Sequence, residues 1–355
     1  MKKPISLSIL FLICFILWNC EPEHKKYNLE TSLLLGLTSA ASPAATSFQL
    51  PDSNQTTCYD TSGVTRSCTG TGEDGEFTNT PAPLAFQIHD SGETILEESS
   101  GLIWQRCTFG MVWNGTTCVG SSISLYWQAA NAYCNSLATA GRIWRLPSAR
   151  ESSLLADHSQ STAYLPNTYF PNGQGAGGWT STAAVAFFGR YLVSSAGNAT
   201  PMDETTNFPV RCVSGSRAPN AGFVDLGDGT VQETNTGLLI KKCAYGQAED
   251  STCSGSANPL NWQQALDYCN NLNFASRTDW RLPSIKESYF ISEPSIGNSN
   301  LPLSIFPNSS QAAISWTGTT FNSTLTTAHA QMIYQMYIYS KTESANVRAR
   351  CVAGP

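Results

Sequence analysis

The sequence predicts an α+β protein in which two copies of one disulfide-stapled domain follow each other along the chain. Three observations predict this fold class. The second half repeats the residue pattern of the first half at a displacement of about 136 residues. Each copy contains four cysteines. Each copy also opens with β-type sequence, continues with two helix-type segments and closes on a strand-like Arg-Cys-Val. A chain of 355 residues is long enough for two such domains.

Residues 1–19 have the pattern of a secretory signal peptide. Two lysines follow the first methionine, and the apolar run after them is too short to span a membrane. Leu17 stands three residues before Cys20, which resembles the lipobox of bacterial lipoproteins; the bulky residues between them resemble the looser lipoboxes of spirochaetes. We expect Cys20 to be lipidated and to anchor the chain in the bacterial cell envelope, at the outer membrane, facing the surface or the periplasm. Ordinary cleavage with a free Cys20 is the alternative.

Residues 20–85 are rich in Ser, Thr, Gly and Pro, a composition typical of a flexible tether. Cys58 and Cys68 lie within this segment and flank an Asp-Thr-Ser-Gly turn signal. We therefore expect a small disulfide-closed hairpin in a tether that holds the domains away from the membrane. The lipid is the only membrane contact expected.

The repeat places the two domains at residues 86–215 and 222–355, joined by a short linker. Matching residues run through both copies in one order and with nearly constant spacing. The pairs include Cys107 with Cys243, Cys118 with Cys253, Cys134 with Cys269, Cys212 with Cys351, Trp144 with Trp280, and Trp179 with Trp316. A period this long is typical of two homologous domains rather than of solenoid repeats.

Each domain is expected to contain two helices after its first strands. Apolar residues at intervals of three and four predict one buried helical face in each copy: Trp127, Ala130, Cys134 and Leu137, then Trp262, Ala265, Cys269 and Leu272. A second helix is predicted by the capping-box spacings Ser148-x-x-Glu151 and Ser284-x-x-Glu287. The Arg-Cys-Val segments are expected to be the final strands.

Four cysteines in each copy allow three pairings. We favour the pairing that joins the helical cysteine to the cysteine beside the final strand, so that the other two close a short loop. The favoured disulfides are Cys134–Cys212, Cys269–Cys351, Cys107–Cys118 and Cys243–Cys253. Other pairings stay open. Metal binding is a further alternative, but no CxxC pair or histidine partner accompanies these cysteines, so no metal and no cofactor is expected.

The ordered motifs resemble the Lcl C-terminal domain family. They are a Gly-Leu-x-Trp near a cysteine, Trp-x-x-Ala-x-x-Tyr-Cys, Trp-Arg-Leu-Pro-Ser-x-x-Glu and a closing Arg-Cys-Val. The resemblance covers both copies and implies a C-type-lectin-like fold with two helices, a small antiparallel sheet and long loops. It also implies an extracellular adhesion protein, with sulfated-glycan binding in the name-giving member. The Glu-Pro-Asn and Trp-Asn-Asp stretches of calcium-dependent lectins are missing here, so calcium-dependent sugar binding is not expected.

Two tryptophans are the candidates for ligand contact. Trp179 and Trp316 fall in the loop-rich region where this fold usually carries its site, with core packing as the alternative. Trp144 and Trp280 are expected in the core, with sugar stacking as the alternative. The arginines that follow them are expected to pair with carboxylates inside the fold.

The composition narrows the function. A net charge of −6 with 20 Lys and Arg argues against nucleic-acid binding, which needs a basic patch. The four histidines, His24, His89, His158 and His329, do not recur at matching positions, which argues against an enzyme. We expect an envelope-anchored, non-catalytic binding or adhesion protein for a glycan, or for an extracellular or envelope protein. The alternatives are a structural or assembly protein of the envelope, and an enzyme with a loop-borne active site.

Overall fold

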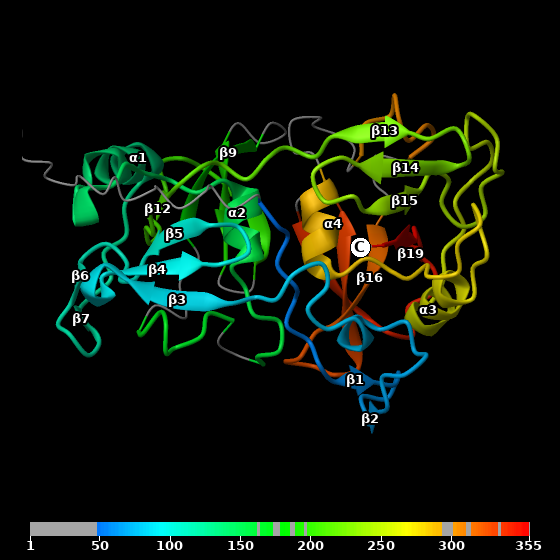
Figure 1. The fold of residues 1–355 in the computed structure, drawn as a ribbon, viewed down its shortest axis with the longest axis horizontal. Coiled ribbons are helices and arrows are strands. Elements are labelled where there is room, and N and C mark those ends of the chain that lie inside the picture. Colours follow the sequence, from blue (N-terminus) through cyan, green and yellow to red (C-terminus); the bar gives the residue numbers. More distant parts are fainter. Residues whose placement is uncertain are drawn as a thin grey trace, which may run out of the picture. The chain divides into compact units, whose positions relative to one another are not determined.

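The structure is a computed structural model that describes residues 48–161, 164–172, 178–184, 189–194, 197–292, 301–309, 314–332 and 335–354. The expected signal peptide, Cys20 and the first part of the expected tether lie outside these ranges. Within them, the chain is an α+β protein with four α-helices and mostly small antiparallel sheets (Figure 1). None of the helices in these ranges is long and apolar enough to cross a membrane.

The first domain is built on a five-stranded antiparallel sheet with strand order β3-β4-β5-β12-β8. Its strands are β3 (Phe86–His89), β4 (Thr94–Glu97), β5 (Leu102–Gln105), β8 (Trp144–Arg145) and β12 (Val213–Ser214). The strand that ends the domain, β12, lies between β5 and β8. Its hydrogen bonds therefore hold the end of the domain against its beginning, as the closing Arg-Cys-Val predicted.

The rest of the first domain consists of a three-stranded sheet, a hairpin and two helices. The sheet has the order β11-β10-β9, and β6 pairs with β7. Their bounds are β6 (Met111–Trp113), β7 (Cys118–Gly120), β9 (Gly178–Ala184), β10 (Gly189–Val193) and β11 (Ala199–Met202). The helices are α1 (Trp127–Ser136) and α2 (Ala149–Leu154), and the 3-10 turns are η2 (Asp90–Gly92) and η3 (Thr139–Gly141).

The second domain repeats this plan with two four-stranded sheets, β13-β14-β15-β20 and β18-β17-β16-β19. The first comprises β13 (Phe223–Asp225), β14 (Thr230–Glu233), β15 (Leu239–Lys241) and β20 (Val352–Ala353). The second comprises β16 (Ile314–Thr320), β17 (Thr327–Met332), β18 (Gln335–Ser340) and β19 (Val347–Arg348), with β19 parallel to β16. The helices are α3 (Trp262–Asn270) and α4 (Ile285–Ile291). In this domain too, the terminal strand pairs with an early one, because β20 pairs with β15.

The helices and the core follow the repeated pattern. On the predicted helical faces, Trp262, Ala265 and Cys269 of α3 and Ala130 and Cys134 of α1 are buried. Trp127, Leu137 and Leu272 are half-buried and pack against the same cores, and the two leucines lie just past the ends of the helices. Trp144 and Trp280 are each 1% exposed, so the expected core placement is confirmed. Their indole nitrogens donate to backbone carbonyls at 2.9 and 3.1 Å, which removes the cost of burying a polar N–H.

The predicted capping boxes also contain a buried ion pair. At the start of α4, the Ser284 hydroxyl accepts from the backbone N–H of Glu287, and the Glu287 carboxylate accepts from the backbone N–H of Ser284. The same carboxylate accepts from both Nη atoms of Arg281 at 2.6 Å. Glu151 binds Arg145 in the same way at 2.7 Å. The arginine of Trp-Arg-Leu-Pro-Ser therefore pairs with a carboxylate inside the fold, as expected, and the motif is structural.

The described part of the chain contains five disulfides, and they are the pairs that the sequence favoured. They are Cys58–Cys68, Cys107–Cys118, Cys134–Cys212, Cys243–Cys253 and Cys269–Cys351. The two long-range bonds connect the first helix of each domain to the residue before its final strand. They reinforce the closure that the β12 and β20 pairings provide.

Residues 48–85 form a packed arm, so the expected flexible tether is wrong for this part of the chain. Leu50 is 1% exposed and packs against Leu154 of the first domain and Phe290 of the second. The buried Asp74 carboxylate accepts a hydrogen bond from a threonine hydroxyl of β16. These contacts depend on a few residues spread through a polar segment, which is why the average composition did not reveal them.

The predicted hairpin is present inside this arm. Strand β1 (Cys58–Tyr59) pairs with β2 (Thr65–Arg66), and the 3-10 turn η1 (Asp74–Glu76) follows. Figure 1 shows the hairpin beside the second domain, where Lys341 donates to the carbonyls of Tyr59 and Asp60 at 2.9 and 3.2 Å. The arm is thus part of the folded body.

The two domains meet where α2 packs against α4. Arg150 of α2 donates to the Ser292 carbonyl at 2.8 Å, and the Tyr289 hydroxyl of α4 accepts from the Ala199 backbone N–H at 3.0 Å. Side chains of both helices share one buried apolar cluster with β10. The helices that follow the two Trp-Arg-Leu-Pro-Ser motifs therefore join the copies.

Candidate ligand-binding site

Trp179 and Trp316, the tryptophans proposed as ligand contacts, are core residues, and that prediction is wrong. Both side chains are 0% exposed. The indole nitrogen of Trp179 donates to the Leu125 carbonyl at 2.7 Å, and that of Trp316 donates to the Leu260 carbonyl at 2.8 Å. The two residues lie on β9 and β16, strands that run through the region expected to be loops, so neither ring is accessible to a ligand at the protein surface.

A different group of residues lines a surface hollow of about 770 Å³ in the first domain. The hollow lies between the end of β3, the turn η2 and the hairpin β6–β7. Its lining comprises Gln87, Ile88, His89, Asp90, Ser91, Gly92, Arg106, Trp113, Gly115 and Thr116. The volume falls in the range of about 300–1,000 Å³ that is usual for ligand pockets.

The indole of Trp113 is held in place by the guanidinium of Arg106. The Arg106 Cζ atom lies 3.6 Å from the Trp113 ring centroid. The guanidinium is itself fixed by the backbone carbonyls of Gly92, Thr168 and Tyr169, to which it donates at 3.1, 2.9 and 3.1 Å. Burial lowers the pKa of Arg106. A fixed cation stacked on one face of an indole restrains the ring, so Trp113 presents a preorganised aromatic surface to the hollow.

Gly92 provides the space that this arrangement needs. Its φ of +92° is a conformation that L side chains rarely adopt. A Cβ atom added there would lie 2.6 Å from the Trp113 Nε1 atom. Glycine is required both by the backbone conformation and by the close approach of the indole.

Asp90 contributes a negative charge to the hollow. Arg142 donates to its carboxylate from Nε at 2.9 Å and from Nη2 at 3.2 Å, and the Thr94 hydroxyl donates at 2.6 Å. The hydrogen bonds from Arg142 hold the pKa of Asp90 at about 2, so the group stays ionised near neutral pH. His89 Nδ1 lies 3.5 Å from the same carboxylate. The hollow therefore combines an aromatic ring with polar groups of fixed orientation.

The second domain does not repeat this arrangement. Residues 243–253, which correspond to the disulfide-closed loop of the first domain, contain no strand. Glu249 in this loop pairs with Lys241, and Lys242, at the position that corresponds to Arg106, pairs with Asp225 at 2.6 Å. The two copies share their scaffold but differ at the surface where the first copy carries its hollow.

Trp113 was not predicted as a site residue, because the candidates were chosen among residues that recur in both copies. The sequence beside Trp113 does contain evidence for its role. Trp113 precedes Asn114-Gly115, a strong hairpin-turn pair, inside the loop between Cys107 and Cys118. An aromatic residue beside such a turn was a candidate for a fixed, exposed ring.

The three described histidines lie in two different settings. His89 lines the hollow, and His24 is outside the described residues. His158 and His329 come from different domains, and their ring centroids lie 5.2 Å apart. Both rings are buried, and their nitrogens have no hydrogen-bond partner among the described residues. Desolvation lowers the pKa of both, to about 3 for His329, so the rings are neutral at pH 7.

Within the described ranges, no group of three or more His, Cys, Asp or Glu side chains could hold a metal ion. The cysteines that raised the metal alternative are in disulfides there. The site with the clearest binding geometry is therefore the hollow around Trp113.

These features define a class of protein: a tandem pair of α+β domains, each closed by two equivalent disulfides and built around the Trp-Arg-Leu-Pro-Ser motif. The family model described as the Lcl C-terminal domain matches residues 93–214 and 229–353. These matches cover more than half of the chain, and the chain belongs to this family. No curated protein and no solved structure matches the chain.

Proposed function

We propose that this chain is a non-catalytic binding protein of the bacterial cell envelope, anchored through a lipid on Cys20, whose ligand site is the hollow around Trp113. The observation that carries the proposal is the indole fixed by Arg106 at the edge of a ligand-sized hollow. A binding module needs a preorganised surface of this kind, with a few polar groups that orient the ligand. The neutral, buried pair His158 and His329 offers no accessible base, which argues against catalysis by these groups.

A glycan without sulfate groups is the ligand class that the hollow favours. Sugar rings stack on aromatic faces, and their hydroxyls donate to carboxylates such as Asp90. A sulfated glycan would need free cationic groups, but Arg106 is already bound to three carbonyls, and Arg142 to Asp90. An envelope or host protein is the second ligand class, since Ile88 in the hollow is 48% exposed and offers an apolar contact.

The proposal includes the C-type-lectin-like fold that the family resemblance implies. Each domain has two helices, small sheets and a final strand next to an early one. The disulfide from the first helix to the end of the domain supports the same proposal. In such a fold the loops can vary while the scaffold stays fixed, which fits a hollow in one copy only.

A ligand screen tests the proposal. The purified chain is applied to a glycan array and to a panel of matrix and envelope proteins at several concentrations. Saturable binding to a glycan is the expected result. Binding only to one envelope protein would instead favour the assembly role, and turnover of an applied compound would favour an enzyme. Absence of saturable binding on both panels would contradict a binding function.

Substitution of Cys20 tests the proposed lipid anchor, and substitution of Cys14 is the matched control. A Cys20→Ala variant should lose metabolic labelling with a fatty acid and should leave the membrane fraction, because the acyl chains supply the membrane affinity. Cys14→Ala, within the expected signal peptide, should keep both. If Cys20→Ala stays labelled, the proposed anchor is wrong.

A further inference from the structure

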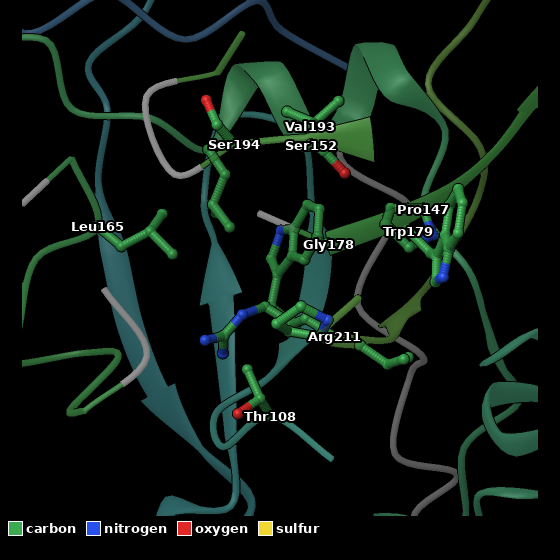
Figure 2. A pocket seen from close by; sticks show the side chains of 13 residues that line it. Thr108, Pro147, Ser152, Leu165, Gly178, Trp179, Val193, Ser194 and Arg211 are labelled. Atoms are coloured by element: carbon green, nitrogen blue, oxygen red, sulfur yellow. The ribbon is translucent and has the colours of Figure 1, made fainter. Parts of the chain in front are cut away.

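The first domain has a small cavity of about 40 Å³ beside the buried Arg211, and the second has one of the same volume beside the half-buried Arg350. Several lining residues of the two cavities occupy equivalent positions in the repeat: Pro147 and Pro283, Ser152 and Ser288, Leu165 and Leu301, and Arg211 and Arg350. Figure 2 shows the cavity of the first domain, with Arg211 and Thr108 toward one end and Val193 and Ser194 toward the other. The space is enough for about one or two water molecules or a single-atom ion.

The arginine in the first domain is buried without a counter-ion. Arg211 is 8% exposed, and its Nη1 atom donates to the carbonyls of Gln105 and Arg106, each at 2.6 Å. Its Nη2 atom is buried and has no hydrogen-bond acceptor within the described ranges, and burial alone, with no nearby carboxylate, shifts its pKa. Burial lowers the pKa of Arg211 to about 10, so the guanidinium keeps its charge at neutral pH. A buried charge of this kind requires compensation.

A second unsatisfied donor belongs to the same cavity lining. Trp104 is 2% exposed, and its indole nitrogen lacks an acceptor in the described part of the chain. The indoles of Trp144 and Trp179 in the same domain do donate to carbonyls. Two buried N–H donors, one of them cationic, therefore come from residues around one small space.

The second domain lacks this excess of donors. Ile240 occupies the position of Trp104, so the indole donor is missing. The Nη2 atom of Arg350 donates to the Ser309 hydroxyl at 2.9 Å, and its Nη1 atom donates to the carbonyls of Lys241 and Lys242. The two domains thus contain cavities of the same size. In the first domain two N–H donors lack acceptors, and in the second domain both Nη atoms of the arginine donate hydrogen bonds.

We propose that the cavity of the first domain is a binding site for one small monovalent anion of the halide class, held by Arg211 Nη2 and Trp104 Nε1. An anion accepts hydrogen bonds from both donors and neutralises the buried guanidinium, which water does not do. A cavity of about 40 Å³ suits a single-atom ion better than a sugar. A bound halide would link β5, which carries Trp104, to the segment before β12, and so would stabilise the closure of the domain.

A bromide-containing crystal tests the site directly, because bromide scatters anomalously and can replace chloride. We expect an anomalous peak within hydrogen-bond distance of Arg211 Nη2 and Trp104 Nε1, and no peak in the cavity beside Arg350. A water molecule without anomalous signal in the first cavity at high bromide concentration would overturn the proposal. A peak of equal height in both cavities would overturn the role of Trp104.

A solution experiment uses the same chain. The unfolding midpoint is measured against chloride concentration for the wild type, Trp104→Phe and Trp144→Phe, with gluconate salts as the reference. Non-specific salt effects are common to all three proteins. We expect a saturable stabilisation by chloride in the wild type and in Trp144→Phe, and its loss in Trp104→Phe. Chloride dependence that is the same in all three proteins would contradict the site.

Discussion

At the scale of single residues, the Glu287 carboxylate shows what the Trp-Arg-Leu-Pro-Ser motif does. It is 0% exposed, accepts from Arg281 through both oxygens and caps α4. The sequence predicted the cap from its spacing, and it predicted a carboxylate partner inside the fold for the arginine without naming the residue. It did not predict that one carboxylate performs both tasks, since this depends on how β20 pairs with the Arg281 segment in three dimensions.

Glu287→Gln should destabilise the chain by about 3–5 kcal/mol, because it leaves the Arg281 charge buried without its partner. Glu151→Gln should lower the free energy of unfolding by less, because the Arg145 side chain is 16% exposed and the Arg281 side chain is only 6% exposed. The free energy of unfolding, measured in urea, checks both values. Equal losses in the two variants would contradict this explanation.

Gly92→Ala should displace the Trp113 indole and lower ligand affinity at least tenfold. The added methyl group meets the ring nitrogen at 2.6 Å and also forces a φ of +92° on alanine. Gly227→Ala is the matched control, because Gly227 has a φ of +79° and open space around the added atom. The control should lose about 1 kcal/mol of stability from strain alone and keep its affinity. Ligand titrations of both variants separate the clash from the strain.

At the scale of elements, the repeat made the helices and disulfides predictable, because each is specified by local spacing or by cysteines that recur. The packed arm and the site were not predictable in the same way. The arm depends on Leu50 and Asp74 meeting residues more than 100 positions away. Trp179 and Trp316 were misassigned because sequence alone did not reveal that their loop-rich region contains β9 and β16.

Removal of the arm disulfide tests whether the arm belongs to the folded body. The double variant Cys58→Ser/Cys68→Ser should lower the free energy of unfolding by about 2–3 kcal/mol, since the bond closes a short loop. Limited proteolysis should then cut first between residues 55 and 75. If global unfolding is unchanged in the variant, the arm contributes nothing to the stability of the domains.

At the scale of the whole molecule, the junction between the two domains contains neutral histidines next to charged groups. The His329 ring lies against the His158 ring, and His158 lies near the fully buried Lys286, whose pKa burial lowers to about 8. Buried carboxylates also face this region, and burial raises the pKa of Asp52 to about 7 and that of Glu97 in the same direction. No sequence pattern places these groups together, because they come from the arm and from both domains.

This junction predicts a pH dependence with a definite sign. Unfolded histidine binds a proton below about pH 6.5, but folded His329 does so only near pH 3. Each buried histidine therefore removes about 1.4 kcal/mol of stability per pH unit as the pH falls below 6.5. The carboxylates with a raised pKa act in the opposite direction. His329→Phe should change the slope of the free energy of unfolding against pH between pH 6 and pH 4 by about 1.4 kcal/mol per pH unit, so that the variant loses less stability than the wild type as the pH falls. Urea unfolding at each pH measures this slope. An unchanged slope would contradict the burial of a neutral ring.

We have proposed that the first domain binds a ligand through the hollow around Trp113. The most direct measurement compares the wild type, Trp113→Ala and Tyr126→Ala on one glycan array at equal concentrations. Tyr126 is an aromatic residue that is 47% exposed and lies outside the hollow, so its variant controls for loss of any surface ring. We predict that Trp113→Ala loses at least tenfold in affinity while Tyr126→Ala binds as the wild type does. Equal binding by Trp113→Ala and the wild type would contradict it.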